Sequence, residues 1–67
     1  MISREQILKV ISEQDIVDSV ESDDYMGFCV YCGEAHDGVE PDAQEYKCEN
    51  CEKKGVYGAQ ELLFMIL

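Results

Sequence analysis

The sequence predicts an α+β fold in which helical segments at the two ends enclose a middle part of short extended segments. Three observations predict this fold: apolar residues recur at helical spacing near both ends, glycine and aromatic residues interrupt the middle, and the four cysteines form two Cys-x2-Cys pairs. With 67 residues, the chain has room for one small domain. We divide this single domain, residues 1–67, into an acidic helical segment over 1–24, a cysteine-containing segment over 25–57 and a C-terminal helix over 58–67.

The N-terminal segment carries two helix-start signals. Ser3 followed by Gln6 is a capping-box pattern, in which the serine hydroxyl satisfies a free backbone N–H of the first turn. Ser12 followed by Asp15 offers a second start. Residues 3–22 therefore predict either one long helix or two short ones.

The middle of the chain predicts short strands. Residues 26–30, 45–48 and 55–58 are the candidates, and Gly38 and Pro41 indicate a loop between the first two. We expect Phe28, Val30, Tyr46, Val56 and Tyr57 to flank the cysteines, and the helices to contact one another through Ile7, Ile11, Leu62, Leu63 and Ile66.

The two cysteine pairs have the spacing of a metal site. Fifteen residues, 33–47, separate Cys29-Val30-Tyr31-Cys32 from Cys48-Glu49-Asn50-Cys51, a spacing typical of zinc sites. Two such turns can complete a tetrahedron of sulfur at ~2.3 Å from one Zn²⁺. Because four thiolates leave no position for water, we expect Cys29, Cys32, Cys48 and Cys51 to hold one structural Zn²⁺.

Other interpretations of the cysteines stay open. An iron site of the rubredoxin type, which carries one electron, has similar turns. Metal-free thiols or disulfides are a further option, although a reducing cytoplasm disfavours disulfides. His36, four residues after Cys32, is a conceivable substitute ligand. Gly33 fits the tight turn after the first pair, whereas the second pair lacks such a glycine.

The fold is expected to depend on the metal. A chain of this length buries only about 60% of its unfolded surface, so its apolar core alone is marginal. Zinc-finger peptides gain roughly 10–16 kcal/mol from their metal at neutral pH. We therefore expect residues 28–57 to be unfolded or molten without zinc.

Negative charge is concentrated in one part of the chain. The protein has 15 acidic and 5 basic residues, a net charge of −10, and residues 13–45 contain eleven acids and neither Lys nor Arg. Such a field repels phosphate and attracts basic surfaces, so direct nucleic-acid binding is disfavoured. We expect a protein partner, in particular a basic, nucleic-acid-handling protein, contacted through Asp18, Glu21, Asp23 and Asp24. The alternative is a nucleic-acid-binding domain that uses Lys47, Lys53 and Lys54.

The C-terminal residues 62–67 are all apolar. Six residues are far short of the ~20 needed to span a bilayer, so no membrane insertion is expected. Contiguous exposed apolar surface usually marks an interface. We expect Leu63, Phe64, Ile66 and Leu67 to contact a partner or a second copy in a homodimer.

No enzymatic chemistry is indicated. The sequence offers no nucleophile–base arrangement, and its carboxylates have no apolar pocket that would separate two pKa values. The N-terminal residues lack the apolar core of a secretory signal, so a cytoplasmic location is expected. These features together predict a non-enzymatic protein-interaction module.

At its cysteine turns the chain resembles the zinc-ribbon class, and more closely a group of small bacteriophage and prophage proteins. The resemblance covers about residues 27–63 and is carried by Gly27-Phe28-Cys29-x2-Cys32-Gly33, Pro41-Asp42-Ala43, Tyr46-x-Cys48-x2-Cys51 and Val56-Tyr57-Gly58-Ala59-x-Glu61-Leu62-Leu63. It implies a zinc-bound β-hairpin with a C-terminal helix, in a group without a defined activity that would act in the host cytoplasm. The chain departs from this group in its acidic N-terminal helical segment, its apolar tail and the missing second glycine.

Overall fold

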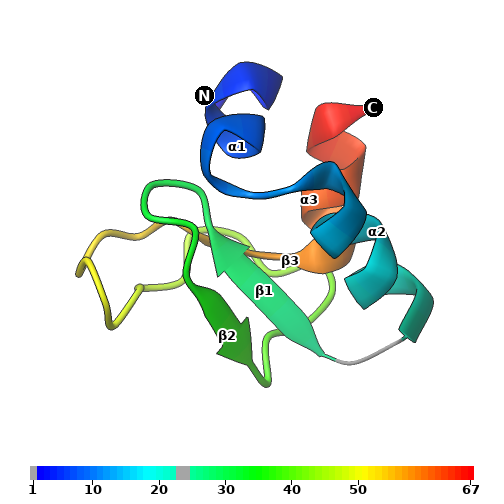
Figure 1. Cartoon of the computed structure of the whole chain (residues 1–67). Coiled ribbons are helices and arrows are strands. Elements are labelled where there is room, and N and C mark those ends of the chain that lie inside the picture. The colour runs from blue at the N-terminus through cyan, green and yellow to red at the C-terminus, as the bar shows by residue number, and fades with distance from the viewer. Residues whose placement is uncertain (1, 23–24) are drawn as a thin grey trace.

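The structure is a computed structural model that describes residues 2–22 and 25–67. Its helices and its antiparallel sheet form a small α+β fold, as the sequence predicts (Figure 1). The elements in chain order are α1 (Arg4–Val10), α2 (Glu13–Ser22), β1 (Met26–Cys29), β2 (Ala35–Asp37), β3 (Val56–Gly58) and α3 (Ala59–Ile66).

The N-terminal helical segment consists of two short helices. The Ser3 hydroxyl accepts a hydrogen bond from the Gln6 backbone N–H at 3.1 Å, so the predicted cap of α1 is confirmed. Ile11 ends α1 in an extended conformation, with φ −129° and ψ 131°. The Ser12 hydroxyl then accepts the backbone N–H of Asp15 at 3.4 Å and caps α2. Ser12 therefore starts a second helix, and residues 3–22 form two short helices rather than one long one.

The sheet has the strand order β2-β1-β3, and both pairings are antiparallel. Phe28 at the centre of β1 lies opposite Ala35 on one side and Tyr57 on the other. The hairpin thus joins β1 to β2, which the sequence analysis did not predict. The strand expected at 45–48 is wrong in extent, because only a single bridge between Tyr46 and Val56 forms there.

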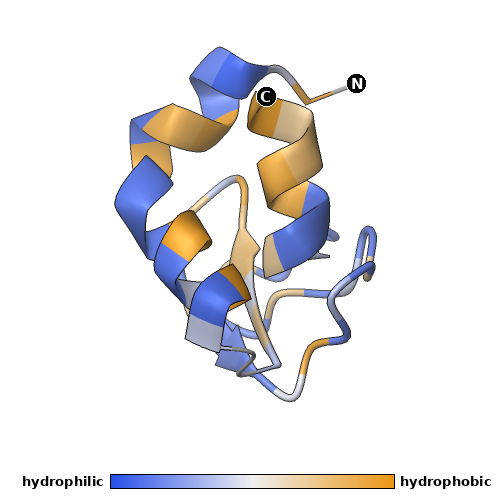
Figure 2. Ribbon diagram, turned by 90° about the vertical axis from the view of Figure 1, so that its right-hand side faces the viewer, coloured by the Kyte–Doolittle hydropathy of each residue, from blue (hydrophilic) through white to orange (hydrophobic). Residues whose placement is uncertain are grey.

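The main apolar core lies between the helices and one face of the sheet. Figure 2 shows the hydrophobic stretches of the helices turned toward one another. The core contains Ile7, Ile11, Ile16, Phe28, Val30, Leu62 and Ile66. Side chains alternate along an extended chain, so Phe28 and Val30 join this core while Cys29 between them faces the opposite side. The expectation that Phe28 and Val30 flank the cysteines is therefore wrong.

A second buried cluster surrounds the cysteines. It contains Cys29, Val39, Ala43, Cys48 and Val56, with Cys51 partly buried against it. Val56 thus flanks the cysteines as expected, whereas the Tyr46 side chain is largely exposed.

Helix α3 buries one face only. Leu62 and Ile66 are buried against the other helices, while Phe64 is 66% exposed and Leu67 is 87% exposed. Ile66 is therefore a core residue and no longer part of the exposed apolar surface expected from the sequence. The Arg4 side chain donates from Nε to the Ile66 carbonyl oxygen at 2.8 Å, which holds the end of α3 against α1. None of the helices in residues 2–22 and 25–67 is long and apolar enough to cross a membrane.

Candidate metal centre

The four cysteines converge at one end of β1. Their Sγ atoms all lie within 4.8 Å of one another, and the Cys29–Cys51 and Cys32–Cys48 pairs are each 3.6 Å apart. These separations are too long for a disulfide bond of about 2.05 Å. Sulfur atoms ~2.3 Å from one ion would be about 3.8 Å apart in a tetrahedron. The predicted cysteines are thus placed to hold a single metal ion.

Each Cys-x2-Cys pair, together with the two residues after it, forms a tight turn that we call a knuckle. In the first knuckle, residues 29–34, the Cys29 carbonyl oxygen accepts the Gly33 N–H at 2.8 Å, and the Cys29 N–H donates to the Glu34 carbonyl oxygen at 3.0 Å. Gly33 has φ +80°, a left-handed conformation that glycine adopts without a steric penalty.

The second knuckle, residues 48–53, repeats this pattern. The Cys48 carbonyl oxygen accepts the Glu52 N–H at 2.7 Å, and the Cys48 N–H donates to the Lys53 carbonyl oxygen at 2.8 Å. Glu52 has φ +64° and so takes the left-handed conformation that Gly33 takes in the first knuckle. The missing second glycine therefore leaves the geometry of the turn intact, and a glutamate bears the strain, which for such residues is of order 1–3 kcal/mol.

Two close backbone approaches fix the first knuckle to the rest of the fold. A Cβ atom on Gly33 would lie 2.5 Å from the Val10 carbonyl oxygen, so the knuckle packs directly on the end of α1. A Cβ atom on Gly55 would lie 2.4 Å from the Tyr31 ring and 3.2 Å from Cys29 Sγ. The Val30 N–H donates to the Gly55 carbonyl oxygen at 2.8 Å, which ties the first knuckle to the chain after the second.

The cysteines differ in their environments. Cys29 and Cys48 are buried, Cys51 is half-buried and Cys32 is exposed. Burial raises the pKa of the Cys29 thiol to about 12, whereas the Glu34 backbone N–H, as the largest influence, lowers the pKa of the Cys32 thiol to about 7. A buried thiolate at Cys29 requires a compensating cation, and a coordinated metal deprotonates its thiol ligands outright. The chemistry of the donor set thus fits a bound metal ion.

Hydrogen-bond donors surround the sulfur atoms. The Tyr31 N–H points at Cys29 Sγ at 3.4 Å, and the Asn50 side-chain amide donates to Cys32 Sγ at 3.6 Å. His36 on β2 places Nε2 3.4 Å from Cys48 Sγ. Such contacts orient metal ligands and tune them. His36 thus contacts a predicted ligand, a position that the sequence could not show because β2 was not anticipated.

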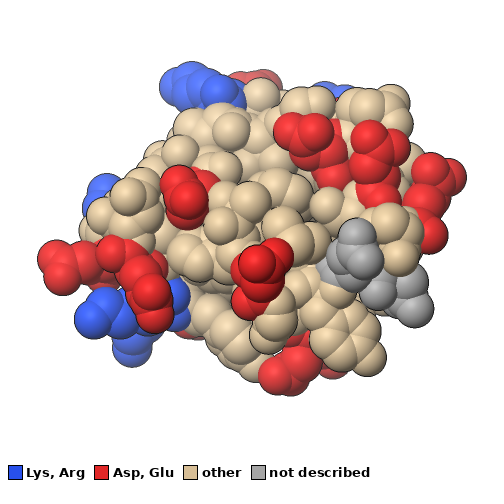
Figure 3. Space-filling view, turned by 60° about the horizontal axis from the view of Figure 1, so that its bottom comes forward, with Lys and Arg blue, Asp and Glu red and all other residues tan. Residues whose placement is uncertain are grey.

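The predicted acidic interaction residues that the structure describes lie on α2, and the four cysteines lie outside this helix. Asp18 and Glu21 are exposed on α2, and Asp23 and Asp24 lie outside the described residues. Figure 3 shows acidic side chains spread across one face of the molecule, with basic ones at its margin. The Lys53 ammonium lies 5.1 Å from the centre of the Tyr31 ring, a cation–π contact beside the first knuckle.

Comparison of the chain with models of known protein families, with curated proteins and with solved structures found no match. The fold and the cysteine cluster define a small α+β domain with four clustered cysteines that can bind a metal, consistent with a zinc-ribbon-like fold.

Proposed function

We propose that Cys29, Cys32, Cys48 and Cys51 bind one Zn²⁺ and that this ion has a structural role. An all-sulfur set of four ligands suits zinc or iron, and four protein ligands leave no position for substrate. A preparation that is colourless and contains one zinc per chain supports zinc. A red preparation with stoichiometric iron would replace this assignment with a one-electron carrier.

The function that we propose is protein interaction without catalysis. The observation that carries it is the exposed apolar surface of α3, where Phe64 is 66% exposed and Leu67 is 87% exposed. Exposed apolar groups next to one another usually mark an interface. Leu63, which is half-buried, borders this surface. In this role the metal centre keeps the fold rigid while α3 makes the contact.

The acidic segment supports a basic partner. Residues 13–45 contain eleven acids and neither Lys nor Arg, and such a field speeds encounter with a positively charged surface at low salt. We propose that the partner is a basic, nucleic-acid-handling protein of a host cytoplasm, whose groove the carboxylates enter in place of phosphates. We propose a phage origin for the protein because its residues 27–63 resemble small bacteriophage and prophage proteins.

Affinity capture from a host lysate tests this proposal. The bait is the tagged, zinc-loaded protein, compared with the variants Phe64→Ser and Tyr46→Ser, which each remove one exposed aromatic ring. We expect one protein to be captured by the wild type and by Tyr46→Ser and to be lost with Phe64→Ser. Capture that persists unchanged with Phe64→Ser would refute the role of α3. Salt-dependent retention on DNA through Lys47, Lys53 and Lys54 would favour the nucleic-acid alternative.

A further inference from the structure

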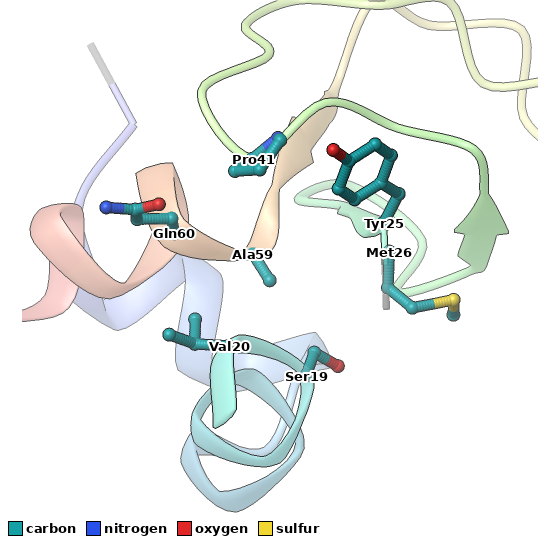
Figure 4. Close-up of a pocket in the computed structure, with 7 residues that line it drawn as sticks. All are labelled: Ser19, Val20, Tyr25, Met26, Pro41, Ala59 and Gln60. Atoms are coloured by element: carbon teal, nitrogen blue, oxygen red, sulfur yellow. The ribbon is translucent and has the colours of Figure 1, made fainter. Parts of the chain in front are cut away.

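A cleft opens between α2 and the start of α3. Figure 4 shows Val20 on α2 on one side, Pro41 and Tyr25 on the other, and Ala59 between them. The cleft has a cavity volume of about 40 Å³. Small-molecule sites usually have about 300–1,000 Å³, so this cleft suits one apolar side chain better than a cofactor.

The cleft continues toward the exposed end of α3. A second hollow is lined by Pro41, Asp42, Gln60, Glu61 and Phe64, so it shares Pro41 and Gln60 with the first. We call the two neighbouring hollows together the α2–α3 groove. The exposed Phe64 side chain thus lines part of this groove.

One wall of the groove is held firmly. The Glu61 N–H in the first turn of α3 donates to the Pro41 carbonyl oxygen at 3.0 Å, and the Gly58 N–H donates to the Ala43 carbonyl oxygen at 3.0 Å. A Cβ atom on Gly58 would lie 2.4 Å from the Pro41 carbonyl oxygen. Because the Pro41 turn is tied to α3 in this way, a ligand would not have to order this wall.

The charges at the groove have one sign. Asp42 and Glu61 line it, and among the described residues neither Lys nor Arg does. Glu21 follows the lining residue Val20 in the chain, Glu40 precedes the lining residue Pro41, and both glutamates are exposed. An apolar floor with a negative rim is complementary to an apolar side chain flanked by cations.

We infer that the α2–α3 groove binds a basic segment of another protein, with one apolar side chain of that segment inserted between Val20 and Pro41. This inference rests on the proposed protein-interaction function and names its binding surface and the chemistry of its partner. A second copy of this chain is the poorer occupant, because it also carries a net charge of −10.

A synthetic amphipathic peptide of leucine and lysine is the probe. It is titrated into the zinc-loaded protein while amide shifts are followed by NMR, and peptides of leucine with glutamate and of lysine alone serve as comparisons. We expect the leucine–lysine peptide to bind most tightly and to shift the amides of Val20, Ala59 and Gln60. Failure to bind, or shifts confined to other parts of the chain, would overturn the inference.

Two matched variants separate the groove from general attraction between charges. Gln60 and Gln14 are both exposed and both lie second in their helices, and only Gln60 lines the groove. Gln60→Lys places a cation against the cationic segment, so we expect about tenfold weaker binding, since like charges at an interface are strongly unfavourable. Gln14→Lys makes the same change in net charge and should weaken binding by less than about twofold. Equal weakening by both variants, with melting and zinc content unchanged, would show that the groove is not the site.

The outcome is distinguishable from that of the lysate experiment. If capture of the host protein depends on Phe64 but the peptide does not bind in the groove, the proposed function stands and this inference is wrong. If capture is independent of Phe64, the role that the proposed function gives to α3 is wrong, whatever the peptide does.

Discussion

Gly33 and Glu52 occupy equivalent positions in the two knuckles. Each donates its backbone N–H to the carbonyl oxygen of the cysteine four residues earlier, at 2.8 Å and 2.7 Å, and each has a left-handed φ, +80° and +64°. The turn that positions a cysteine pair therefore demands a left-handed residue at this point. Only the first knuckle supplies the residue type that adopts this conformation without strain.

Replacing Glu52 by glycine should therefore stabilise the zinc-loaded protein. Relief of the left-handed strain, of order 1–3 kcal/mol, outweighs the greater freedom of glycine in the unfolded chain, roughly 0.5–1 kcal/mol. We expect the free energy of unfolding to rise by about 1 kcal/mol in urea denaturation. The control is Glu49→Gly in the same turn. Glu49 is not among the residues with positive φ, so this variant should have a lower free energy of unfolding than the wild type. A loss of stability in both variants would contradict this account of the second knuckle.

Gly33→Ala should lower the free energy of unfolding by more than the cost of a left-handed alanine alone. The new Cβ would meet the Val10 carbonyl oxygen at 2.5 Å in addition to adopting φ +80°. We expect a loss of about 2–4 kcal/mol. Gly38→Ala is the matched control, because Gly38 has φ +69° with nothing within 4 Å of its Cβ position, and about 1–2 kcal/mol should be lost there. Equal losses would mean that the contact between the first knuckle and α1 contributes nothing.

Cys48→Ser should abolish stoichiometric zinc binding. Cys48 is buried within the sulfur cluster, and a serine hydroxyl is a much poorer ligand for this metal. Zinc content after gel filtration measures the effect, and Asn50→Ala is the comparison. Asn50 only donates a hydrogen bond to Cys32, so its loss should weaken zinc binding about 10- to 100-fold without changing the stoichiometry. Full zinc occupancy in Cys48→Ser would refute the four-thiolate site and indicate His36, whose Nε2 lies 3.4 Å from Cys48 Sγ, as the substitute ligand.

Neutralising four acidic residues of the 13–45 segment should slow partner association. Replacing Asp18, Glu21, Asp23 and Asp24 by Asn or Gln lowers the attractive field, which acts over ~8 Å at physiological ionic strength. We expect slower association with the captured partner, a weaker dependence on salt, and nearly unchanged zinc content and melting. Glu5→Gln and Glu49→Gln, outside the 13–45 segment, are the controls. Association that ignores both salt and these substitutions would exclude an electrostatic mechanism and leave the exposed apolar residues Phe64 and Leu67 as the main contact.

The sequence predicted the cysteine cluster and the terminal helices because their signals are local. Cysteine spacing and the Ser3 cap act within a few residues, and the structure confirms the helix start and brings the cysteines together. Strand β2 was not predictable in this way, because Ala35-His36-Asp37 has no apolar alternation and forms a strand only through pairing with β1. The α2–α3 groove likewise depends on segments far apart in the chain.

We propose that one zinc ion held by the four cysteines is required for the fold. The decisive measurement is thermal melting followed by circular dichroism, on samples of measured zinc content with and without excess chelator. We expect one zinc per chain and a cooperative melt that is lost when the chelator removes the metal, because zinc contributes roughly 10–16 kcal/mol in zinc-finger peptides. An unchanged cooperative melt in the zinc-free protein would show that the fold does not need the metal.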